Sequence, residues 1–318
     1  MWWPFPTFAG AALALIVERF LGYPKPVYEK ISHPAVWIGW LITWLDRKLN
    51  QGGADATEGR LRGIVALLAL IAAAFIPAII VSQLLATTRV GWIFEALIAT
   101  SLIAQKSMRD HVMEVYRAFG KSLPAARHAV SMIVGRDPSQ LDESGVSKAA
   151  LESLAENTSD GIVAPVLWFA LLGLPGIAVY KAVNTADSMI GHKSERYLHF
   201  GWASARFDDL INLPASRLTG ILFAATQPSR FRYIVDVMLR DAPKHGSPNA
   251  GWPEAAMAAA LDLKFGGPRA YQGEVVDLPW IGEGREHMTR NDIKRGLKTY
   301  SRAMWVLFLG MVVLGIII

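Results

Sequence analysis

The stretch GIVALLALIAAAFIPAIIVSQLLATT, from Gly63 to Thr88, decides the fold class because it contains no charged residue. The hydrocarbon core of a bilayer is about 30 Å thick, and about 20 apolar residues of helix cross it. We therefore expect a transmembrane helix in this segment. Three further apolar segments predict transmembrane helices: Met1–Val17, Val90–Gln105 and Ala303–Ile318. Met1–Val17 lacks the positive start of a signal peptide, so we interpret it as a retained anchor.

Two more apolar segments, Gly161–Tyr180 and Asp209–Thr226, are broken by polar or helix-breaking residues. The interruptions are Pro165, Gly173, Pro175 and Gly176 in the former and Pro214 and Arg217 in the latter. Irregular backbone at membrane depth is tolerated where it is buried in protein or lines a cavity. This slightly favours the interpretation that both segments are re-entrant. The alternative, that both cross the membrane as a pair, stays open. The segment His33–Leu45 is too short to cross and is interpreted as re-entrant or interfacial.

The composition supports a membrane protein. Hydrophobic residues make up 52% of the 318 residues, charged residues only 19%, and the mean hydropathy is +0.28. A soluble chain has roughly 25% charged residues. Lys and Arg number 32 against 27 Asp and Glu, a net charge of +5, but they form no basic run interleaved with aromatic residues, so we expect no nucleic-acid partner. The lack of Cys excludes disulfides, thiolate nucleophiles and Cys-ligated metals.

The expected fold is an all-α polytopic integral membrane protein, with four firm transmembrane helices and two broken or re-entrant segments. We expect one membrane-embedded domain over residues 1–318. The placement of Lys and Arg puts the N-terminus outside and the segments of about 106–160 and 227–302 in the cytoplasm, both helical. Within them, Ser147 is the expected cap of a helix over 148–160, and Pro253 is expected to open a helix that ends at Leu263.

The densest chemical signal is an acidic stripe. On a helix, Glu152, Glu156 and Asp160 lie at positions i, i+4 and i+8, on one face. Like charges at this spacing repel unless a cation lies against them. Mg²⁺ bridged to phosphate suits such a stripe, since it takes one or two carboxylates plus phosphate oxygens. The alternative is a solvated acidic face.

A polar patch follows the first broken segment. Asn184, Asp187, Ser188 and Gly191 share one helical face, between Lys181 and Lys193. Ionisable residues in or beside a membrane are candidates for function. Lysine side chains often extend to the polar surface of the membrane, and this would explain Lys181 and Lys193 without a function. It would not explain the polar residues of the shared face.

Two further clusters combine acids, bases and turn residues. In the first, Asp208 and Asn212 are four residues apart, and Arg206 and Asp209 three, so an internal ion pair is the structural alternative. The second precedes a predicted helix, whose free N–H groups would favour an anion. It suits phosphate as a cluster, although a capping or turn role for its histidine is equally compatible. Its members are Arg240, Lys244, His245, Ser247 and Asn249.

These motifs resemble the CobD/CbiB family, the membrane-bound adenosylcobinamide-phosphate synthases of cobalamin biosynthesis. The resemblance covers most of the chain, to about Glu274. It rests on these stretches: His33-Pro34 with Gly39, Glu152–Gly161, Asn184–Gly191, Arg206–Asp209, Arg240–Ala242, His245–Gly251, Gly266-Gly267 and Tyr271-x-Gly273-Glu274.

The resemblance implies an enzyme of the bacterial inner membrane, a multi-pass ligase that forms a C–N bond. It would use ATP to join adenosylcobyric acid, a corrinoid, to (R)-1-amino-2-propanol phosphate or a similar amino-alcohol phosphate. The expected partners are these substrates, ATP as co-substrate and the lipid bilayer, with Mg²⁺ as cofactor. A homo-oligomer is compatible with the sequence.

The residue roles are our hypothesis within this resemblance. Glu156, Asp160 and Asp187 are assigned to Mg²⁺, with Glu152 as a further ligand. Lys181, Lys193 and Arg206 would contact the triphosphate, and Arg240 and His245 the amino-alcohol phosphate. Asp208 or Asp209 would accept a proton from the attacking ammonium. The remaining candidates for substrate contacts are Asn184, Ser188, Ser247 and Asn249.

Two other functions compete with the ligase. Broken helices and polar groups at mid-membrane are typical of transporters, although no inverted repeat is visible in the sequence. A membrane signalling protein in the manner of AmpE would not require the acidic stripe and the phosphate cluster together. Binding of Mg·ATP by the purified protein separates both from the ligase.

Overall fold

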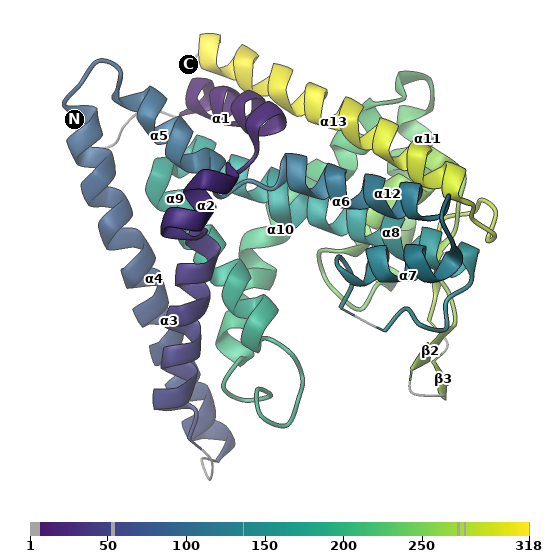
Figure 1. Ribbon diagram of the computed structural model, residues 1–318, viewed down its shortest axis with the longest axis horizontal. Coiled ribbons are helices and arrows are strands. Elements are labelled where there is room, and N and C mark those ends of the chain that lie inside the picture. Colours follow the sequence, from purple (N-terminus) through teal and green to yellow (C-terminus); the bar gives the residue numbers. More distant parts are fainter. Residues whose placement is uncertain (1–6, 52–54, 136, 272–273, 277, 318) are drawn as a thin grey trace. The chain divides into compact units, whose positions relative to one another are not determined.

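The computed structural model describes residues 7–51, 55–135, 137–271, 274–276 and 278–317 (Figure 1). Among these residues the chain forms two compact units. The first comprises residues 7–104, 164–212 and 310–317, and the second comprises 105–163 and 213–309.

Helices dominate both units. The α-helices that begin in the first unit are α1 (Phe8–Leu21), α2 (Lys25–Ile31), α3 (Pro34–Leu49), α4 (Ala56–Ala86), α5 (Gly91–Thr100), α9 (Ala164–Ile190) and α10 (Trp202–Ala225). Those that begin in the second are α6 (Gln105–Ala118), α7 (Leu123–Ser131), α8 (Glu143–Thr158), α11 (Phe231–Asp241), α12 (Gly251–Leu261) and α13 (Arg290–Ile317). A π-helix, η1 (Ser159–Val163), joins α8 to α9, and the 3-10 turns are η2 (Pro228–Arg230) and η3 (Ala242–Lys244).

The all-α expectation missed four very short strands in the second unit. They are β1 (Phe265–Gly266), β2 (Arg269–Tyr271), β3 (Glu274–Val276) and β4 (Trp280–Ile281). β1 pairs with β4 and β2 with β3, both antiparallel. Strands of two or three residues are too short to show the alternation of apolar and polar side chains by which a sequence reveals a strand.

Three helical segments of the described chain are long and apolar enough to cross a membrane: Ala56–Ala86, Glu143–Ile190 and Arg290–Ile317. Two of them contain most of the spans predicted from Gly63 and from Ala303. The third contains Gly161–Tyr180, so this broken segment lies in a helical stretch that is long enough to cross. The protein is therefore an α-helical membrane protein, but its spans differ from the predicted set.

The other predicted spans are not confirmed as membrane-crossing helices. α5 has ten residues, which at 1.5 Å per residue extend about 15 Å, half of a hydrocarbon core. Turns at Thr88 and Ser101 bound it, where side-chain hydroxyls bond to carbonyls three residues back. α1 has 14 residues, and residues 1–6 of the predicted first span lie outside the described chain. α10 passes through Pro214 as a helix and is not among the three apolar segments.

α9 contains the break that the sequence predicts. Gly173 has φ 62° and ψ −157°, a backbone conformation open essentially to glycine alone, and Pro175 follows within the helix. The residues after the break, from Leu174 to Ile190, continue as helix and carry the predicted polar patch. The break therefore separates an apolar first part of α9 from a second part that carries the predicted polar patch.

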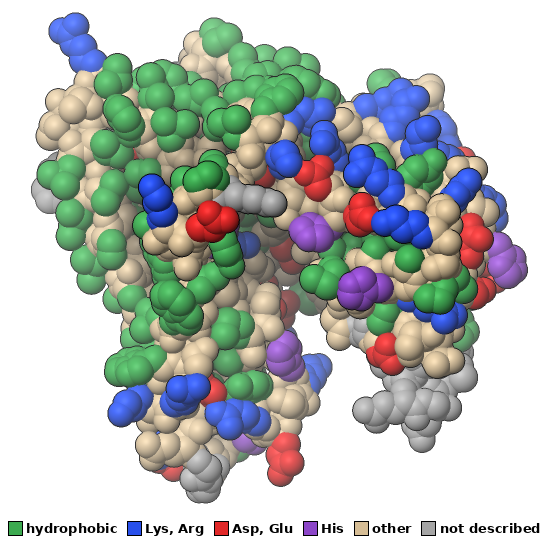
Figure 2. All heavy atoms as spheres, in the orientation of Figure 1, with side chains coloured by type: hydrophobic (Ala, Val, Ile, Leu, Met, Phe, Trp, Pro, Cys, Tyr) green, Lys and Arg blue, Asp and Glu red, His purple; other side chains and the backbone are tan. Residues whose placement is uncertain are grey.

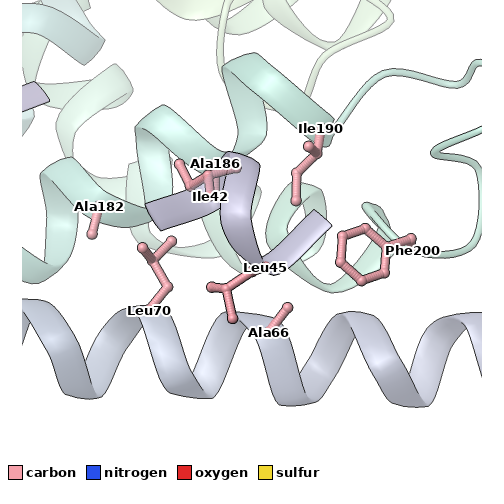
Figure 3. Close-up of a cluster of buried hydrophobic side chains, with 8 residues drawn as sticks. All are labelled: Ile42, Leu45, Ala66, Leu70, Ala182, Ala186, Ile190 and Phe200. Carbon is pink, nitrogen blue, oxygen red and sulfur yellow. The ribbon is translucent and has the colours of Figure 1, made fainter. Parts of the chain in front are cut away.

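The core of the first unit is built by α3, α4 and α9. α3 lies beside α4 in Figure 1, and Figure 3 shows how small and large side chains of the three helices meet. The cluster consists of Ile42, Leu45, Ala66, Leu70, Ala182, Ala186, Ile190 and Phe200. The opposite side of α4 is exposed, with Leu68 59% and Leu84 66% accessible, as expected of a helix that faces lipid. Hydrophobic side chains dominate the visible surface around α4 in Figure 2.

The core of the second unit surrounds α12. Its residues from Pro253 to Leu261 are all buried, and helices that are apolar all round are typical of a protein core. The prediction of an Ala-rich helix opened by Pro253 is thus confirmed, with a start two residues earlier and an end at Leu261. The buried Tyr300 hydroxyl of α13 donates to the Gln105 carbonyl of α6 over 2.6 Å.

The predicted cap of α8 was wrong. α8 begins at Glu143, and the Asp142 carboxylate caps it by accepting from the Gly145 N–H over 2.7 Å. Ser147 lies fully buried within the helix. Asp and Ser are both good caps, so residue type alone did not distinguish the two positions.

Candidate functional site

The predicted site residues fall into two groups, one in each unit. In the first unit they come from the second part of α9 and the first part of α10. The Asp208 carboxylate accepts from the Asn212 side-chain amide over 2.9 Å and from that of Asn184 over 3.4 Å. The Tyr180 hydroxyl in turn donates to the side-chain carbonyl of Asn212 over 2.8 Å. Three polar side chains of two helices thus hold one carboxylate in place.

Asp208 is 7% exposed, and burial disfavours its charged form. Burial, with a smaller contribution from the charge of Asp187, raises the pKa of Asp208 to about 7, although the two amides that donate to it oppose this shift. The pKa of the half-buried Asp209 is also raised by burial, against the nearby charges of Arg206 and Lys193. Asp208 is therefore a carboxyl that exchanges a proton near neutral pH.

The neighbouring predicted residues make mostly local contacts. Ser188 donates to the Asn184 carbonyl over 2.9 Å, a bond within the helix. Arg206 and Asp209 form the predicted i, i+3 ion pair at 3.6 Å, on an arginine that is 68% exposed. Gly191 gives close approach, as expected, but to a protein group, because a Cβ at this position would overlap the Asp187 carboxylate. Lys181 is half-buried and Lys193 exposed.

His33 has a structural role. Its Nδ1 atom accepts from the Ala35 N–H over 3.1 Å and caps α3, and its ring lies edge-on to Tyr23 with centroids 4.6 Å apart. Burial, together with the charge of Lys181, lowers the pKa of His33. Only a neutral imidazole has the lone pair that this cap requires.

The acidic stripe of the second unit has three different environments. Glu152 is buried, and its Oε1 accepts from the Gly266 N–H over 2.9 Å. Lys148 donates to the Gly266 carbonyl over 2.8 Å, so the two residues of α8 fix β1 from both sides. Glu156 is exposed, and Asp160 is half-buried within the π-helix η1. π-helical turns are frequent at functional sites.

The basic residues of the second unit converge on one acid. Asp241 is 1% exposed, and its carboxylate accepts from Arg240 over 2.7 and 2.8 Å, from Lys244 over 2.7 Å and from the Gly282 N–H over 2.9 Å. These donors hold the pKa of Asp241 far below its usual range, against the effect of burial. Arg240 also pairs with Glu283. The predicted phosphate contact Arg240 thus has two carboxylate partners in this structure.

The turn before α12 is built by its own side chains. The His245 Nδ1 atom accepts from the Ser247 N–H over 2.9 Å, and the Ser247 hydroxyl accepts from the Asn249 and Ala250 N–H groups, both over 3.2 Å. The side-chain carbonyl of Asn249 accepts from the Ser216 hydroxyl over 3.1 Å and from Arg217 over 3.0 Å. The turn role that the sequence left open for His245 is therefore confirmed, and its role toward phosphate stays a prediction.

Four residues of these networks were not predicted: Tyr180, Asp241, Arg217 and Trp252. Arg217 was noted in the sequence as an interruption of an apolar segment and was not assigned to the site. A charged residue that interrupts an apolar helix is itself a functional signal, and it would have drawn attention to Arg217. Nothing in the sequence indicated Tyr180 or Trp252, because their partners lie 32 and 35 residues away.

Among the described residues there is no group of three or more Asp, Glu or His side chains that would enclose a metal ion. A closed protein cage therefore does not fit. Mg²⁺ commonly keeps water and phosphate oxygens and uses one or two carboxylates. The exposed Glu156 and the half-buried Asp160 of the second unit fit this open type of site.

The chain matches the family described as CobD/Cbib protein over residues 11–300. It is 50% identical over 293 residues to the "Cobalamin biosynthesis protein CobD" of Rhodobacter capsulatus, with 92% of each chain covered. It is also 50% identical to the protein of that name from Sinorhizobium fredii over 301 residues (92% of this chain, 91% of the relative), and 43% identical to that from Brucella suis over 301 residues (92% of each). No solved structure matches the chain.

Proposed function

Because this chain belongs to the CobD/CbiB family of cobalamin biosynthesis, we propose that it is an ATP-dependent amide synthase. It joins the free propionate of adenosylcobyric acid to the amine of (R)-1-amino-2-propanol phosphate and gives adenosylcobinamide phosphate. It acts as a multi-pass protein of the bacterial inner membrane. The three apolar helical segments and the relatives named above support this proposal.

The observation that carries the proposal is the Asp208 network. An amine that attacks an acyl group must lose a proton, and most amines are protonated at neutral pH. A general base works best when its pKa is near the working pH. Asp208 has such a pKa, and Asn184 and Asn212 hold its carboxylate in a fixed orientation.

The proposed reaction has two steps. In the first, a propionate oxygen attacks the γ-phosphorus of ATP, ADP leaves, and an acyl phosphate forms. In the second, the amine nitrogen attacks the acyl carbon, Asp208 takes the proton, and inorganic phosphate leaves with one of the original propionate oxygens. Phosphoryl transfer needs positioning and charge neutralisation more than a protein nucleophile, which suits a chain without cysteine.

The other residues bind and orient the substrates in this proposal. Mg²⁺ would neutralise phosphate charge, and the two carboxylates of the second unit that would hold it are those of Glu156 and Asp160. Lys181, Lys193 and Arg206 contact the triphosphate, and Arg240 and His245 the amino-alcohol phosphate. Asn184, Ser188, Ser247 and Asn249 provide polar contacts. Asp209, which lies beside Asp208 in the chain, is the second candidate base.

The experiment that tests this function is an assay of detergent-purified protein. The reaction contains adenosylcobyric acid, aminopropanol phosphate and Mg·ATP, and the corrinoid product is identified by its mass. We expect adenosylcobinamide phosphate and one ADP per amide bond, with no product when ATP, Mg²⁺ or the amino alcohol is omitted. Uptake of labelled corrinoid into vesicles without ATP, and no new corrinoid mass, would instead indicate a transporter.

A further inference from the structure

Arg217 of α10 is fixed in the second unit by one nitrogen. Its Nη1 atom donates to the Asn249 side-chain carbonyl over 3.0 Å, to the Ser216 hydroxyl over 2.9 Å and to the Leu213 carbonyl over 3.2 Å. All three acceptors are neutral. They orient the guanidinium group without neutralising its charge.

An aromatic ring contacts the same guanidinium group. The guanidinium carbon of Arg217 lies 4.3 Å from the centroid of the Trp252 ring, within the range of a cation–π contact. The ring is itself anchored, because Trp252 Nε1 donates to the Pro248 carbonyl over 3.1 Å. Asn249, the main acceptor of Arg217, belongs to the same turn. The guanidinium is therefore preorganised by the turn that precedes α12.

Other arginines of this unit have carboxylate partners. Arg230 pairs with Asp262 at 2.6 Å, Arg240 with Asp241 at 2.7 Å, and Arg295 with Asp292 at 2.9 Å. Arg217 has no carboxylate within ion-pair distance among the described residues, and its Nε and Nη2 atoms have no hydrogen-bond acceptor there. Burial lowers the pKa of Arg217, and no nearby charge of the described residues opposes this shift. An arginine remains charged at neutral pH nevertheless.

A half-buried charge without a counter-ion is costly unless something else compensates it. The Nε and Nη2 atoms form the edge of a guanidinium that grips two oxygens of a phosphate or carboxylate at once. This edge of Arg217 has no acceptor among the described residues, while its Nη1 atom is anchored. The arrangement is that of a receptor for an oxyanion.

We propose that Arg217 binds a phosphate group of one of the two phosphorylated substrates, aminopropanol phosphate or ATP, through its Nε and Nη2 edge. This inference rests on the proposed function for the identity of the ligands. It adds a binding residue to those predicted from the sequence. In this proposal Trp252 and Asn249 are positioning residues, because they orient the Arg217 guanidinium.

The test compares Arg217→Lys with Arg230→Lys. Lysine keeps the charge but cannot bind two oxygens in a plane. Arg230 is a matched control, because it also lies over an aromatic ring, Tyr233 at 5.0 Å, but is paired with a carboxylate. We expect Arg217→Lys to raise the KM of one phosphorylated substrate by about tenfold to a hundredfold, as when a charge-assisted hydrogen bond is lost. Which KM rises identifies the source of the phosphate.

The KM of adenosylcobyric acid, which has no phosphate, should not change in either variant. Unchanged KM values for both phosphorylated substrates in Arg217→Lys would overturn the proposal. An equal rise for all three substrates together with a lower melting temperature would also overturn it, because this pattern indicates a structural role only.

A second measurement separates this inference from the proposed function. Binding of inorganic phosphate to the purified protein is measured by its effect on the melting temperature, without any turnover. The wild-type protein and Arg230→Lys should respond at similar phosphate concentrations, and Arg217→Lys only at concentrations about tenfold higher or more. If the wild-type protein makes no amide but shows this difference, the ligase proposal fails and the anion site stands. If the three proteins respond alike, the anion site fails.

Discussion

In the first unit, three aspartates lie close enough for their charges to interact, Asp187, Asp208 and Asp209, and the cation that pairs with Asp209 is exposed. In the second unit the charges are balanced, because Arg240 and Lys244 converge on the buried Asp241 and Arg240 also pairs with Glu283. Two clusters with a similar density of charged residues in the sequence thus differ in how much charge remains available to bind a ligand. A cluster with excess acid favours binding of a cation or a proton, whereas a balanced cluster stabilises the fold.

The largest expected effect is on catalysis in the acidic cluster. Asp208→Asn removes the proton acceptor and keeps the size of the side chain, so turnover should fall by about a hundredfold to ten-thousandfold, the usual contribution of a general base. Amide formation by purified protein measures it. Glu195→Gln, an exposed acid of the same unit, is the control and should retain full activity. An Asp208→Asn protein with normal turnover would transfer the role of base to Asp209.

The pH dependence of the rate tests the same carboxyl. Its pKa of about 7 is raised, so Asp208 is protonated below neutral pH and ionised above it. As the base must be ionised, kcat should rise with pH through about 7 and reach a plateau, and this rise should be missing from the residual activity of Asp208→Asn. A rise with the same midpoint in both proteins would show that another group titrates.

The next effect is on stability in the balanced cluster. Asp241→Asn leaves Arg240 and Lys244 without their shared counter-ion, and breaking a buried pair costs about 3 kcal/mol or more. We expect a value at this lower end, because both cations are about half exposed. Thermal unfolding in detergent measures it, with the exposed Asp236→Asn as control. Equal melting temperatures of the two variants would mean that the cluster does not stabilise the fold.

The smallest effect concerns the break in α9, which precedes the acidic cluster. Gly173→Ala places a Cβ on a backbone with φ 62°, which should lower the free energy of unfolding by about 1–3 kcal/mol. Gly310→Ala is the matched control, because a Cβ there meets no atom within 4 Å and alanine favours helix. Melting temperatures compare the two. No loss of stability in Gly173→Ala would show that the break is not needed for the fold.

Local spacing predicted part of the site correctly. The contacts Asp208–Asn212 and Arg206–Asp209 are three or four residues apart on one helix, and helical geometry brings such residues together wherever the helix forms. The break at Gly173 was equally evident, because glycine and proline act on the backbone at their own positions. The membrane character followed from composition and from the uncharged run after Gly63.

What the sequence did not reveal depends on distant partners. Arg240 has the composition of a phosphate ligand, but it is paired with Glu283, 43 residues away. Arg217 was taken as an interruption of an apolar segment, whereas Trp252 and Asn249 hold it in place. The length of α5 was overestimated because hydropathy does not show where a helix ends and a turn begins. Charge alone therefore identifies candidate ligands, and tertiary contacts decide which of them are available.

The most direct test of the ligase follows the oxygen atoms of the propionate. Adenosylcobyric acid labelled with ¹⁸O in this carboxylate is incubated with the protein, aminopropanol phosphate and Mg·ATP, and the released phosphate is analysed by mass spectrometry. Activation as an acyl phosphate predicts one ¹⁸O atom in each phosphate released and one in the amide product. Amide product with unlabelled phosphate would contradict this mechanism, and the absence of any amide would contradict the proposed function itself.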